Sequence, residues 1–362
     1  KVEWGEFKLD DLFTINTSKK RFDANKVKVL ENGNFPYVVR TSLNNGIKGY
    51  INEDEAFLNE GNTISFGQDT ATMFYQENPY FTGDKIKIVK SKDERFNKRN
   101  AQFFILSMNK SFSSFSWGSS SFNVKIIENQ KIQLPTKNGE LDYEFMEIFV
   151  AELAAQRVAE LAAHLKVTGL NDYHLTAVEK QVLEDFENGI IAFSEFTFVN
   201  IFNKILQGRR LKKEDQITGD IPFVMAGTTN TGIAKYISNP VAKFPKNSIT
   251  IDIFGNTFYR NYDFGAGDDT GVYWNSEKEY SQKTMLYLTS SMSKLISGKF
   301  DFGNKLRSSQ SLDFKIQLPI HNNKPNYKLM ETFITAIQKL VIKEVVLYAD
   351  RKIEATKSVI AN

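Results

Sequence analysis

Ile132-Gln133-Leu134-Pro135 returns later in the chain as Ile316-Gln317-Leu318-Pro319, and in both places a long segment with no interior Pro or Gly follows. Working outward from these two stretches, further matches appear in the same order in both halves, at an offset that stays between 184 and 189 residues. A collinear series with so long a period predicts a duplicated domain and not a solenoid. The matched stretches include residues 6–9 with 195–198, 36–38 with 222–224, 46–51 with 232–237, 62–65 with 247–250, and 83–84 with 267–268.

The segments that follow the two repeats have the periodicity of helices. Apolar residues recur at steps of three and four from 143 to 165 and from 327 to 353, which predicts two long helices of about 35–40 Å each. Because they occupy equivalent places in the two copies, we expect them to pack against each other antiparallel, like a coiled coil, with pseudo-twofold symmetry. The alternative is that each helix packs only on its own domain.

The body of each copy contains short strand signals and one shorter helical stretch, near 97–110 and 281–297. The sequence therefore predicts an α+β fold in which two strand-rich domains are separated by two long helices. We expect domains at residues 1–138 and 195–324, a helical spacer and connector at 139–194, and a C-terminal helical spacer at 325–362. Within the connector, Thr176 and Glu179 have the spacing of a capping box that opens a short helix, which Gly189 ends.

The composition is that of an ordinary globular protein, with 41% hydrophobic and 25% charged residues. The chain has no Cys, and its three His residues (His164, His174, His321) are too far apart for metal-ligand spacing. No apolar run has the length that crosses a bilayer. We therefore expect no metal and no membrane partner, and a location in the reducing cytoplasm.

Charge is distributed unevenly along the chain. Residues 1–138 have a net charge of +4, 139–194 of −8, 195–324 of +5 and 325–362 of +2. Two basic blocks separated by an acidic segment indicate two surfaces for a polyanion, although values of this size also occur by ordinary scatter.

Motifs that carry chemistry are largely missing. Asn78-Pro79-Tyr80-Phe81 resembles the loop of amino-methyltransferases but lacks its second Pro, so a turn that buries Tyr80 and Phe81 is the better interpretation. Residues 265–271 are rich in Gly but run into a predicted strand, unlike a dinucleotide loop. Glu6-Phe7-Lys8 and Asp313-Phe314-Lys315 have nuclease-like spacing without the Pro-Asp partner. We therefore predict no catalytic residues.

Binding residues are easier to find. Basic runs early in each copy are suited to phosphates, and amide or guanidinium side chains in turns are suited to base edges. The alternative is that these segments are merely solvated turns. The candidate DNA-binding residues are Lys19, Lys20, Arg21, Arg40, Asn44, Asn45, Gln68, Thr70, Ser120 and Asn123 in the first copy, and Arg209, Arg210, Lys212, Asn230, Asn256, Tyr259, Arg260, Lys305, Arg307, Ser308 and Gln310 in the second.

Taken together, the duplicated opening (Glu6-Phe7-Lys8-Leu9), the Ile-Gln-Leu-Pro before each helix and the two helices resemble the specificity subunits of type I restriction-modification enzymes. The connector Leu170-Asn171-Asp172-Tyr173-His174-Leu175-Thr176 is most similar to the BcgI-like type IIB branch. The resemblance implies two target-recognition domains that each read half of a split double-stranded DNA site, and helices that set the spacer and dock methyltransferase subunits. It also implies restriction subunits as partners, and it assigns S-adenosylmethionine, Mg²⁺ and ATP to the partners, with no cofactor in this chain.

Two other classes of function remain open at this stage. One is a self-contained DNA methyltransferase or nuclease, and the other is a helical scaffold that binds no DNA. A silent or anti-restriction variant of the specificity subunit is a further possibility.

Overall fold

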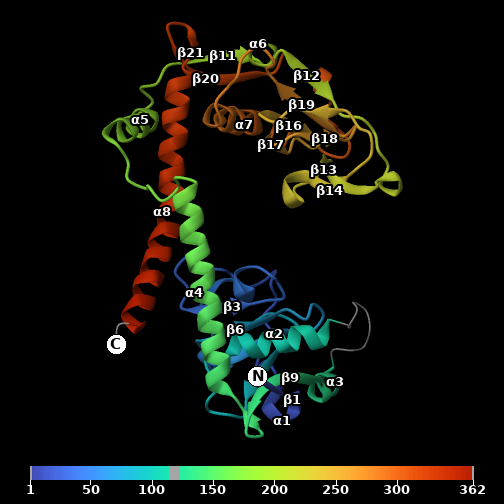
Figure 1. Cartoon of the computed structure of the whole chain (residues 1–362), viewed down its shortest axis with the longest axis vertical. Helices are drawn as coiled ribbons and strands as arrows, with labels where there is room; N and C mark the ends of the chain where they lie inside the picture. Colours follow the sequence, from blue (N-terminus) through green and yellow to red (C-terminus); the bar gives the residue numbers. More distant parts are fainter. Residues whose placement is uncertain (1, 114–122, 361–362) are drawn as a thin grey trace. The chain divides into compact units, whose positions relative to one another are not determined.

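The computed structural model describes residues 2–113 and 123–360, with side chains as far as residue 356, and it divides into two compact units (Figure 1). Unit 1 comprises residues 1–161 and 352–362, and unit 2 comprises residues 162–351. Both boundaries fall inside a long helix, the first in α4 (Tyr143–Val167) and the second in α8 (Tyr327–Ile360). None of the described helices is long and apolar enough to cross a membrane.

Unit 1 is built from three small sheets, with strand orders β1-β9-β10, β2-β8-β5-β6 and β4-β3-β7. Its strands are β1 (Glu3–Lys8), β2 (Phe13–Thr17), β3 (Phe35–Val38), β4 (Ile47–Ile51), β5 (Thr63–Gly67), β6 (Met73–Gln76), β7 (Phe81–Thr82), β8 (Ile86–Ser91), β9 (Lys131–Lys137) and β10 (Glu140–Leu141). Its helices before α4 are α1 (Leu9–Leu12), α2 (Ala101–Phe112) and α3 (Val124–Asn129), with short 3₁₀ turns η1 (Asn44–Gly46) and η2 (Glu55–Phe57).

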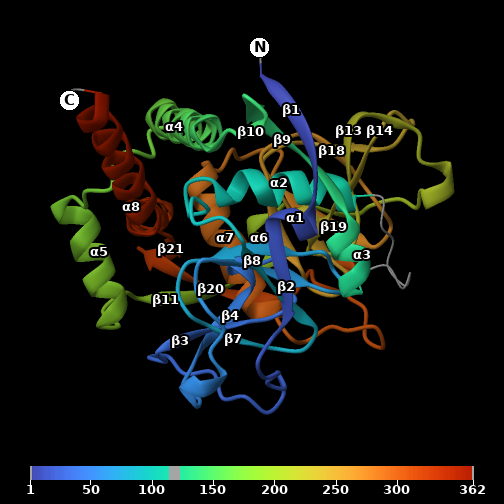
Figure 2. The same cartoon turned by 90° about the horizontal axis from the view of Figure 1, so that it is seen from below.

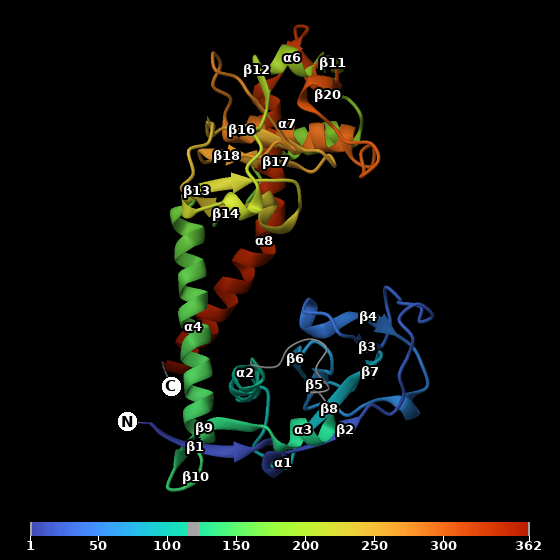
Figure 3. The ribbon, with the colours of Figure 1, turned by 90° about the vertical axis from the view of Figure 1, so that its right-hand side faces the viewer.

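The first strand closes unit 1 against the strand that leads into α4. β1 pairs antiparallel with β9, with Gly5 opposite Leu134, and the β9–β10 hairpin then turns directly into α4. Figure 3 shows this sheet on one side of the unit and the β4-β3-β7 sheet on the other. The repeated Ile-Gln-Leu-Pro stretch is therefore a structural junction, since its strand holds both the chain start and the base of the long helix.

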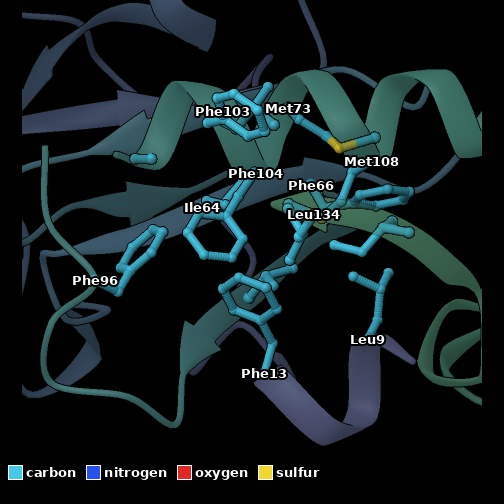
Figure 4. Packing of buried hydrophobic residues seen from close by; sticks show 14 of the residues in the cluster. Leu9, Phe13, Ile64, Phe66, Met73, Phe96, Phe103, Phe104, Met108 and Leu134 are labelled. Carbon is cyan, nitrogen blue, oxygen red and sulfur yellow. The ribbon is translucent and has the colours of Figure 1, made fainter. Parts of the chain in front are cut away.

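The core of unit 1 lies between α2 and the four-stranded sheet. α2 lies alongside β9 (Figure 2), and its buried residues face apolar residues of β5 and β9 (Figure 4). Phe13 meets Phe96 and Phe104 edge to face, with ring centroids 5.7 and 5.5 Å apart. Such aromatic pairs stabilise a core beyond their buried area, because the edge of one ring is attracted to the face of the other.

Unit 2 repeats this plan, with sheets ordered β11-β20-β21, β12-β19-β16-β17 and β14-β13-β18-β15. Its strands are β11 (Phe193–Thr197), β12 (Lys204–Gln207), β13 (Thr218–Val224), β14 (Ile233–Ile237), β15 (Lys243–Phe244), β16 (Ser248–Asp252), β17 (Thr257–Arg260), β18 (Phe264–Ala266), β19 (Thr270–Trp274), β20 (Lys315–His321) and β21 (Lys324–Pro325). The remaining elements are α5 (Ala177–Glu187), α6 (Phe198–Ile201) and α7 (Gln282–Ile296), with 3₁₀ turns η4 (Lys213–Asp215), η5 (Thr229–Gly232) and η6 (Ser308–Gln310).

Strand registers show that the repeat found in the sequence is also present in the structure. Ile64 lies opposite Val89 in unit 1, and Ile249 lies opposite Tyr273 in unit 2. Each unit also has a parallel pair, β3 with β7 and β13 with β18, beside a bulge at the same place. The α+β fold of two duplicated strand-rich domains, each followed by a long helix, is confirmed.

Local predictions hold well, apart from two helix ends: α2 begins at Ala101 and not at Asn97, and α8 ends later than expected. The helices expected near 97–110, 143–165 and 281–297 are α2, α4 and α7, while α8 continues past the predicted residue 353 to Ile360. Thr176 and Glu179 form the expected capping box, and Gly189 follows α5 with a φ of +66°. Tyr80 and Phe81 are fully buried, and the Gly-rich segment 265–271 runs into β19 and not into a helix.

A part-buried carboxylate anchors each long helix to its own unit. On α4, Glu147 Oε1 accepts hydrogen bonds from Asn97 Nδ2 (3.0 Å) and Asn100 Nδ2 (3.1 Å) at the start of α2. On α8, the equivalent Glu331 accepts a hydrogen bond from Ser281 Oγ (2.6 Å) at the start of α7. The repeated glutamate thus ties each long helix to the helix that covers the core.

We expect Glu147→Ala to lower the free energy of unfolding of unit 1 by about 2 kcal/mol, because two part-buried amide donors lose a charged acceptor. Urea titration of the full chain measures this change. Glu144→Ala is the matched control, since its exposed pair with Lys137 (3.6 Å) contributes little. Equal effects of the two substitutions would contradict the anchor.

Candidate nucleic-acid interface

The first predicted basic run lies beside the end of a core strand. β2 pairs with β8 so that Thr17 lies opposite Lys87, and the chain then continues through Lys19, Lys20 and Arg21. The next residue, Phe22, donates its backbone N–H to Thr82 O (2.9 Å), which brings the run against β7. Side chains from β8 and from the basic run therefore share one surface.

That surface is concave. Two depressions of about 680 and 420 Å³ share Arg21 and together form what we call the basic groove. Six basic and two acidic side chains line it. The lining includes the predicted residues Lys19, Lys20, Arg21, Arg40, Gln68 and Thr70, together with Lys85, Lys87, Asp23 and Asp84. The fold thus brings together six predicted residues that are up to 51 positions apart in sequence.

Acidic neighbours hold several of these cations in place. Asp69 Oδ2 accepts hydrogen bonds from Arg40 Nη1 (2.5 Å) and Lys85 Nζ (2.7 Å), and Asp84 accepts one from Arg21 Nη1 (3.1 Å). The Lys20 ammonium lies over the Phe57 ring, 4.3 Å from its centroid. The groove is therefore preorganised, because its longest side chains are restrained before a ligand arrives.

Burial also changes the titration of one groove lysine. Lys87 is mostly covered, and this burial, together with the nearby charge of Arg21, lowers the pKa of its ammonium. An anion in the groove would raise that pKa again, since an opposite charge favours the protonated form. Neither Lys85 nor Lys87 was predicted from sequence. The alternation of charged and apolar residues at 85–88, on a strand next to the basic run, is the signal that could have found them.

The other candidates of unit 1 lie outside the groove. Asn44 and Asn45 are exposed in η1 with φ of 46° and 52°, and the side chain of Asn44 donates to Ile47 O. Asn123 is the N-cap of α3, where its side-chain oxygen accepts the Ile126 N–H (3.0 Å). Ser120 lies outside the described residues.

In unit 2 the basic run meets two loops. Arg209 donates its backbone N–H to Ala266 O (2.9 Å), while its side chain and those of Arg210 and Lys212 are exposed. Gln207 joins the neighbouring loops, since its Nε2 donates to Asp268 O (3.0 Å) and its Oε1 accepts the Ser308 N–H (2.9 Å). These contacts define a loop cluster made of residues 207–212, 266–269 and 304–310.

Further predicted residues belong to this loop cluster. Arg307 Nη1 donates to Asp268 O, and the Arg307 N–H donates to Gln310 Oε1 (2.6 Å). Lys305 is exposed, with its ammonium 4.5 Å from the centroid of the Phe302 ring, whereas the Ser308 side chain is buried. Asn230 is exposed in η5 with a φ of 47°, outside the loop cluster.

The prediction that Arg260 reads bases does not fit the structure. Arg260 is 1% exposed, and its guanidinium donates to Thr250 Oγ1 (3.0 Å), Thr231 O (2.6 Å) and the Tyr262 hydroxyl (2.9 Å). Burial lowers its pKa, but these acceptors satisfy the charged group. Arg260 is therefore a structural residue inside unit 2.

Tyr259 and Asn256 also have internal roles. The Tyr259 hydroxyl donates to Asn247 Oδ1 (3.1 Å), and Tyr75 makes the same bond to Asn62 (2.9 Å) in unit 1. Asn256 Nδ2 donates to the buried Asp252 Oδ2 (2.8 Å). These bonds stabilise the β16–β17 hairpin, and both side chains remain part-exposed.

Candidate metal ligands do not cluster in the described ranges 2–113 and 123–360. No group of three or more His, Cys, Asp or Glu side chains there could hold a metal ion. What the geometry offers is a set of restrained cations and amides on a concave surface, which can bind a polyanion.

Comparison with known proteins agrees with this arrangement. The family model described as type I restriction modification DNA specificity domain matches residues 1–163 and again 192–347. The specificity subunit S.BcgI of a type II restriction enzyme from Heyndrickxia coagulans is 27% identical over 348 residues, which cover 94% of this chain and 96% of that one. The crystal structure of the type I restriction-modification S subunit from M. genitalium covers 99% of this chain and 94% of its own, with a TM-score of 0.56 and 13% identity, and supports the fold. The chain thus belongs to the family of type I restriction-modification DNA specificity domains, of which it carries two copies, and the predicted resemblance to specificity subunits is confirmed.

Proposed function

We propose that this chain is the DNA-reading, non-catalytic subunit of a restriction-modification complex, and that each unit reads one half of a bipartite, asymmetric site in double-stranded DNA. The observation that carries the proposal is the basic groove of unit 1, where six predicted residues line one concave surface within a duplicated fold. In unit 2 the loop cluster is the equivalent reading surface.

Within the groove the side chains divide into two kinds. Lys19, Lys20 and Arg21 suit phosphates, which fix the position of a protein on the duplex without reading sequence. Arg40, Gln68 and Thr70 can hydrogen-bond base edges, and the two acceptors of a guanine edge suit an arginine best. The ion pair of Arg40 with Asp69 fixes the guanidinium plane, so that Arg40 can present its free donors in one orientation.

The domain limits follow the same division. We propose that residues 1–138 and 195–324 are the target-recognition domains, and that 139–194 and 325–362 are spacers that pack antiparallel and dock the methyltransferase subunits. Restriction subunits would complete the complex, and S-adenosylmethionine, Mg²⁺ and ATP would be bound by the partners. The similarity to a BcgI specificity subunit favours the type IIB branch, and we expect the complex to act in the cytoplasm.

We expect the triple substitution of Lys19, Lys20 and Arg21 by Ala to weaken binding to duplex DNA. The slope of log K against log salt should also become shallower by about 2 to 3, since each lost phosphate contact removes roughly 0.9. Fluorescence anisotropy at several salt concentrations measures both quantities.

The matched control for this variant replaces Lys92, Lys98 and Lys137 by Ala. It removes the same charge from residues that do not line the basic groove, and Lys92 follows the end of β8 opposite to Lys87. If the control changes the salt slope as much as the groove variant, the groove is not the phosphate-binding surface.

The spacer role predicts a change in the recognised site. α4 has 25 residues, about 37 Å at 1.5 Å per residue, which is close to the roughly 34–36 Å of one DNA turn. Insertion of four residues after the exposed Ala154 adds about 6 Å, so the spacer should lengthen by about two base pairs while both half-sites stay the same. Sequencing of methylated sites in cells that carry the partner subunits measures this.

A four-residue insertion in the exposed Asn138-Gly139 turn, outside both helices, is the control and should leave the spacer unchanged. An unaltered spacer in the Ala154 variant would show that α4 does not set the distance.

The absence of catalysis in this chain has a direct test. Purified chain incubated with duplex DNA and labelled S-adenosylmethionine, or with DNA and Mg²⁺, should give no methyl transfer and no cleavage above background. Turnover without partner subunits would favour a self-contained enzyme.

A further inference from the structure

Unit 1 carries an open apolar groove that DNA reading does not use. It has a volume of about 490 Å³ and lies between β1, β9, α2 and α4, and we call it the aromatic groove. Three of its large apolar side chains are unusually exposed, with Trp4 at 54%, Leu106 at 61% and Phe149 at 41%. Contiguous apolar surface of this kind marks a binding site for another molecule.

The rings in the aromatic groove form a connected cluster, in which Trp4 stacks on Phe103 and Phe149 meets Phe103 edge to face. Phe103 lies 6.2 Å from Trp4 and 5.7 Å from Phe149, and Phe149 lies 6.0 Å from Phe145, all between ring centroids. Phe103 is itself buried, so it holds the exposed rings on the core of unit 1. The groove is therefore a rigid surface.

Unit 2 shows what such a surface binds. Equivalent positions follow from the strand registers and the 184-residue offset: Trp4 corresponds to Phe193, Phe103 to Tyr287 and Phe149 to Phe333. There the ring of Phe186, on the connector helix α5, lies 4.0 Å from the ring of Phe333 and 5.9 Å from that of Phe193. The equivalent surface is thus covered by a helix of the chain itself, which lies beside α8 in Figure 1.

Polar contacts fix α5 in this place. Lys339 Nζ on α8 donates to Glu179 Oε2 (3.1 Å) and to the His174 carbonyl oxygen (2.8 Å), and it pairs with Asp172 (3.1 Å). Burial opposes ionisation of Glu179, but the Thr176 N–H and Lys339 outweigh it and lower its pKa. The carboxylate therefore stays charged at neutral pH and locks the start of the helix.

Charge also distinguishes the helix from its surroundings. α5 contains Glu179, Glu184, Asp185 and Glu187 against a single Lys180, and is strongly acidic. The charged residues that line the aromatic groove of unit 1 are Lys110, Lys131 and Glu6, with a net positive charge. Lys131 pairs with Glu6, whereas Lys110 has no ion-pair partner in the described part of the chain. A basic border beside exposed rings complements an acidic helix with an apolar anchor.

The connector occurs once in the sequence, so the described residues of unit 1 contain no counterpart of α5. We propose that the aromatic groove of unit 1 binds an acidic amphipathic helix of a partner protein, which inserts a Phe or Leu side chain among Trp4, Leu106 and Phe149 as Phe186 does in unit 2. Helix-in-groove recognition of this kind rests on anchors at helical spacing. The inference goes beyond DNA reading and depends only on the duplicated fold.

The experiment uses the full chain and a fluorescein-labelled peptide with the sequence of residues 171–190 as the probe for such a helix. Anisotropy should show saturable binding. The emission of Trp4 should move to shorter wavelength, a change that a Trp4→Phe chain lacks. A peptide with Phe186→Ala should bind about 30-fold more weakly, since loss of a central aromatic anchor has effects of that size.

Leu106→Glu tests the groove itself, because this exposed side chain can be replaced without disturbing the core, and the new charge repels an acidic helix. We expect it to weaken peptide binding at least tenfold while DNA binding stays unchanged. Leu43→Glu is the matched control, 73% exposed and outside the groove, and should bind the peptide normally.

Three results would overturn the proposal: no binding of the peptide, equal binding by the Leu106→Glu chain, or a self-association of the wild-type chain that Leu106→Glu abolishes. The last result would make a second copy of this chain the occupant. A chain that binds DNA but not the peptide rejects only the proposal for the aromatic groove. A chain that binds the peptide but not DNA rejects only the DNA-reading function.

Discussion

The structure depends on a part-buried carboxylate that joins each long helix to the start of the helix covering its core. Glu147 accepts two amide donors at the start of α2, and Glu331 accepts hydroxyl donors at the start of α7. Hydrogen bonds from several donors to one charged acceptor are strong and directional. It fixes the angle at which a helix leaves its domain, which apolar contacts alone would leave adjustable. If the helices hold two reading surfaces apart, as we propose, this angle has to be fixed.

The framework could be predicted from sequence because the fold is duplicated, so that each buried position requires an apolar residue in both copies. Positions that are buried in both units keep apolar residues at the same spacing, as Met108 and Met292 do at an offset of 184. Junction residues such as Leu134 and Leu318 are repeated for the same reason. The end of α8 was predicted too early because the apolar pattern ends near 353, whereas the backbone hydrogen bonds of a helix continue without it.

The candidate site was predicted less evenly. Lys19, Lys20 and Arg21 follow a strand end and reach the surface, so that a run of charge was a sufficient signal. Arg260 looks the same as a surface arginine in sequence, yet Thr231 and Thr250, from other segments, surround it with acceptors. Those partners depend on the tertiary fold. No local pattern distinguishes an arginine whose donors are satisfied inside from one that is free to bind.

The two units thus share a framework of strands and helices and differ in the loops on its surface. In unit 1 charge is restrained by Asp69 and Asp84 around an open groove, while in unit 2 the Gln207 and Arg307 contacts tie the loops to each other. Two reading surfaces on one chain bind with a high effective concentration, because the second half-site is presented as soon as the first is bound. That gain requires helices that hold the two surfaces at a fixed distance. Reading two different half-sites requires loops that differ between the units. The sequence shows the same division between framework and loops. Its repeated stretches lie in the strands and at the starts of the long helices, and its differences lie in the loops that would contact DNA.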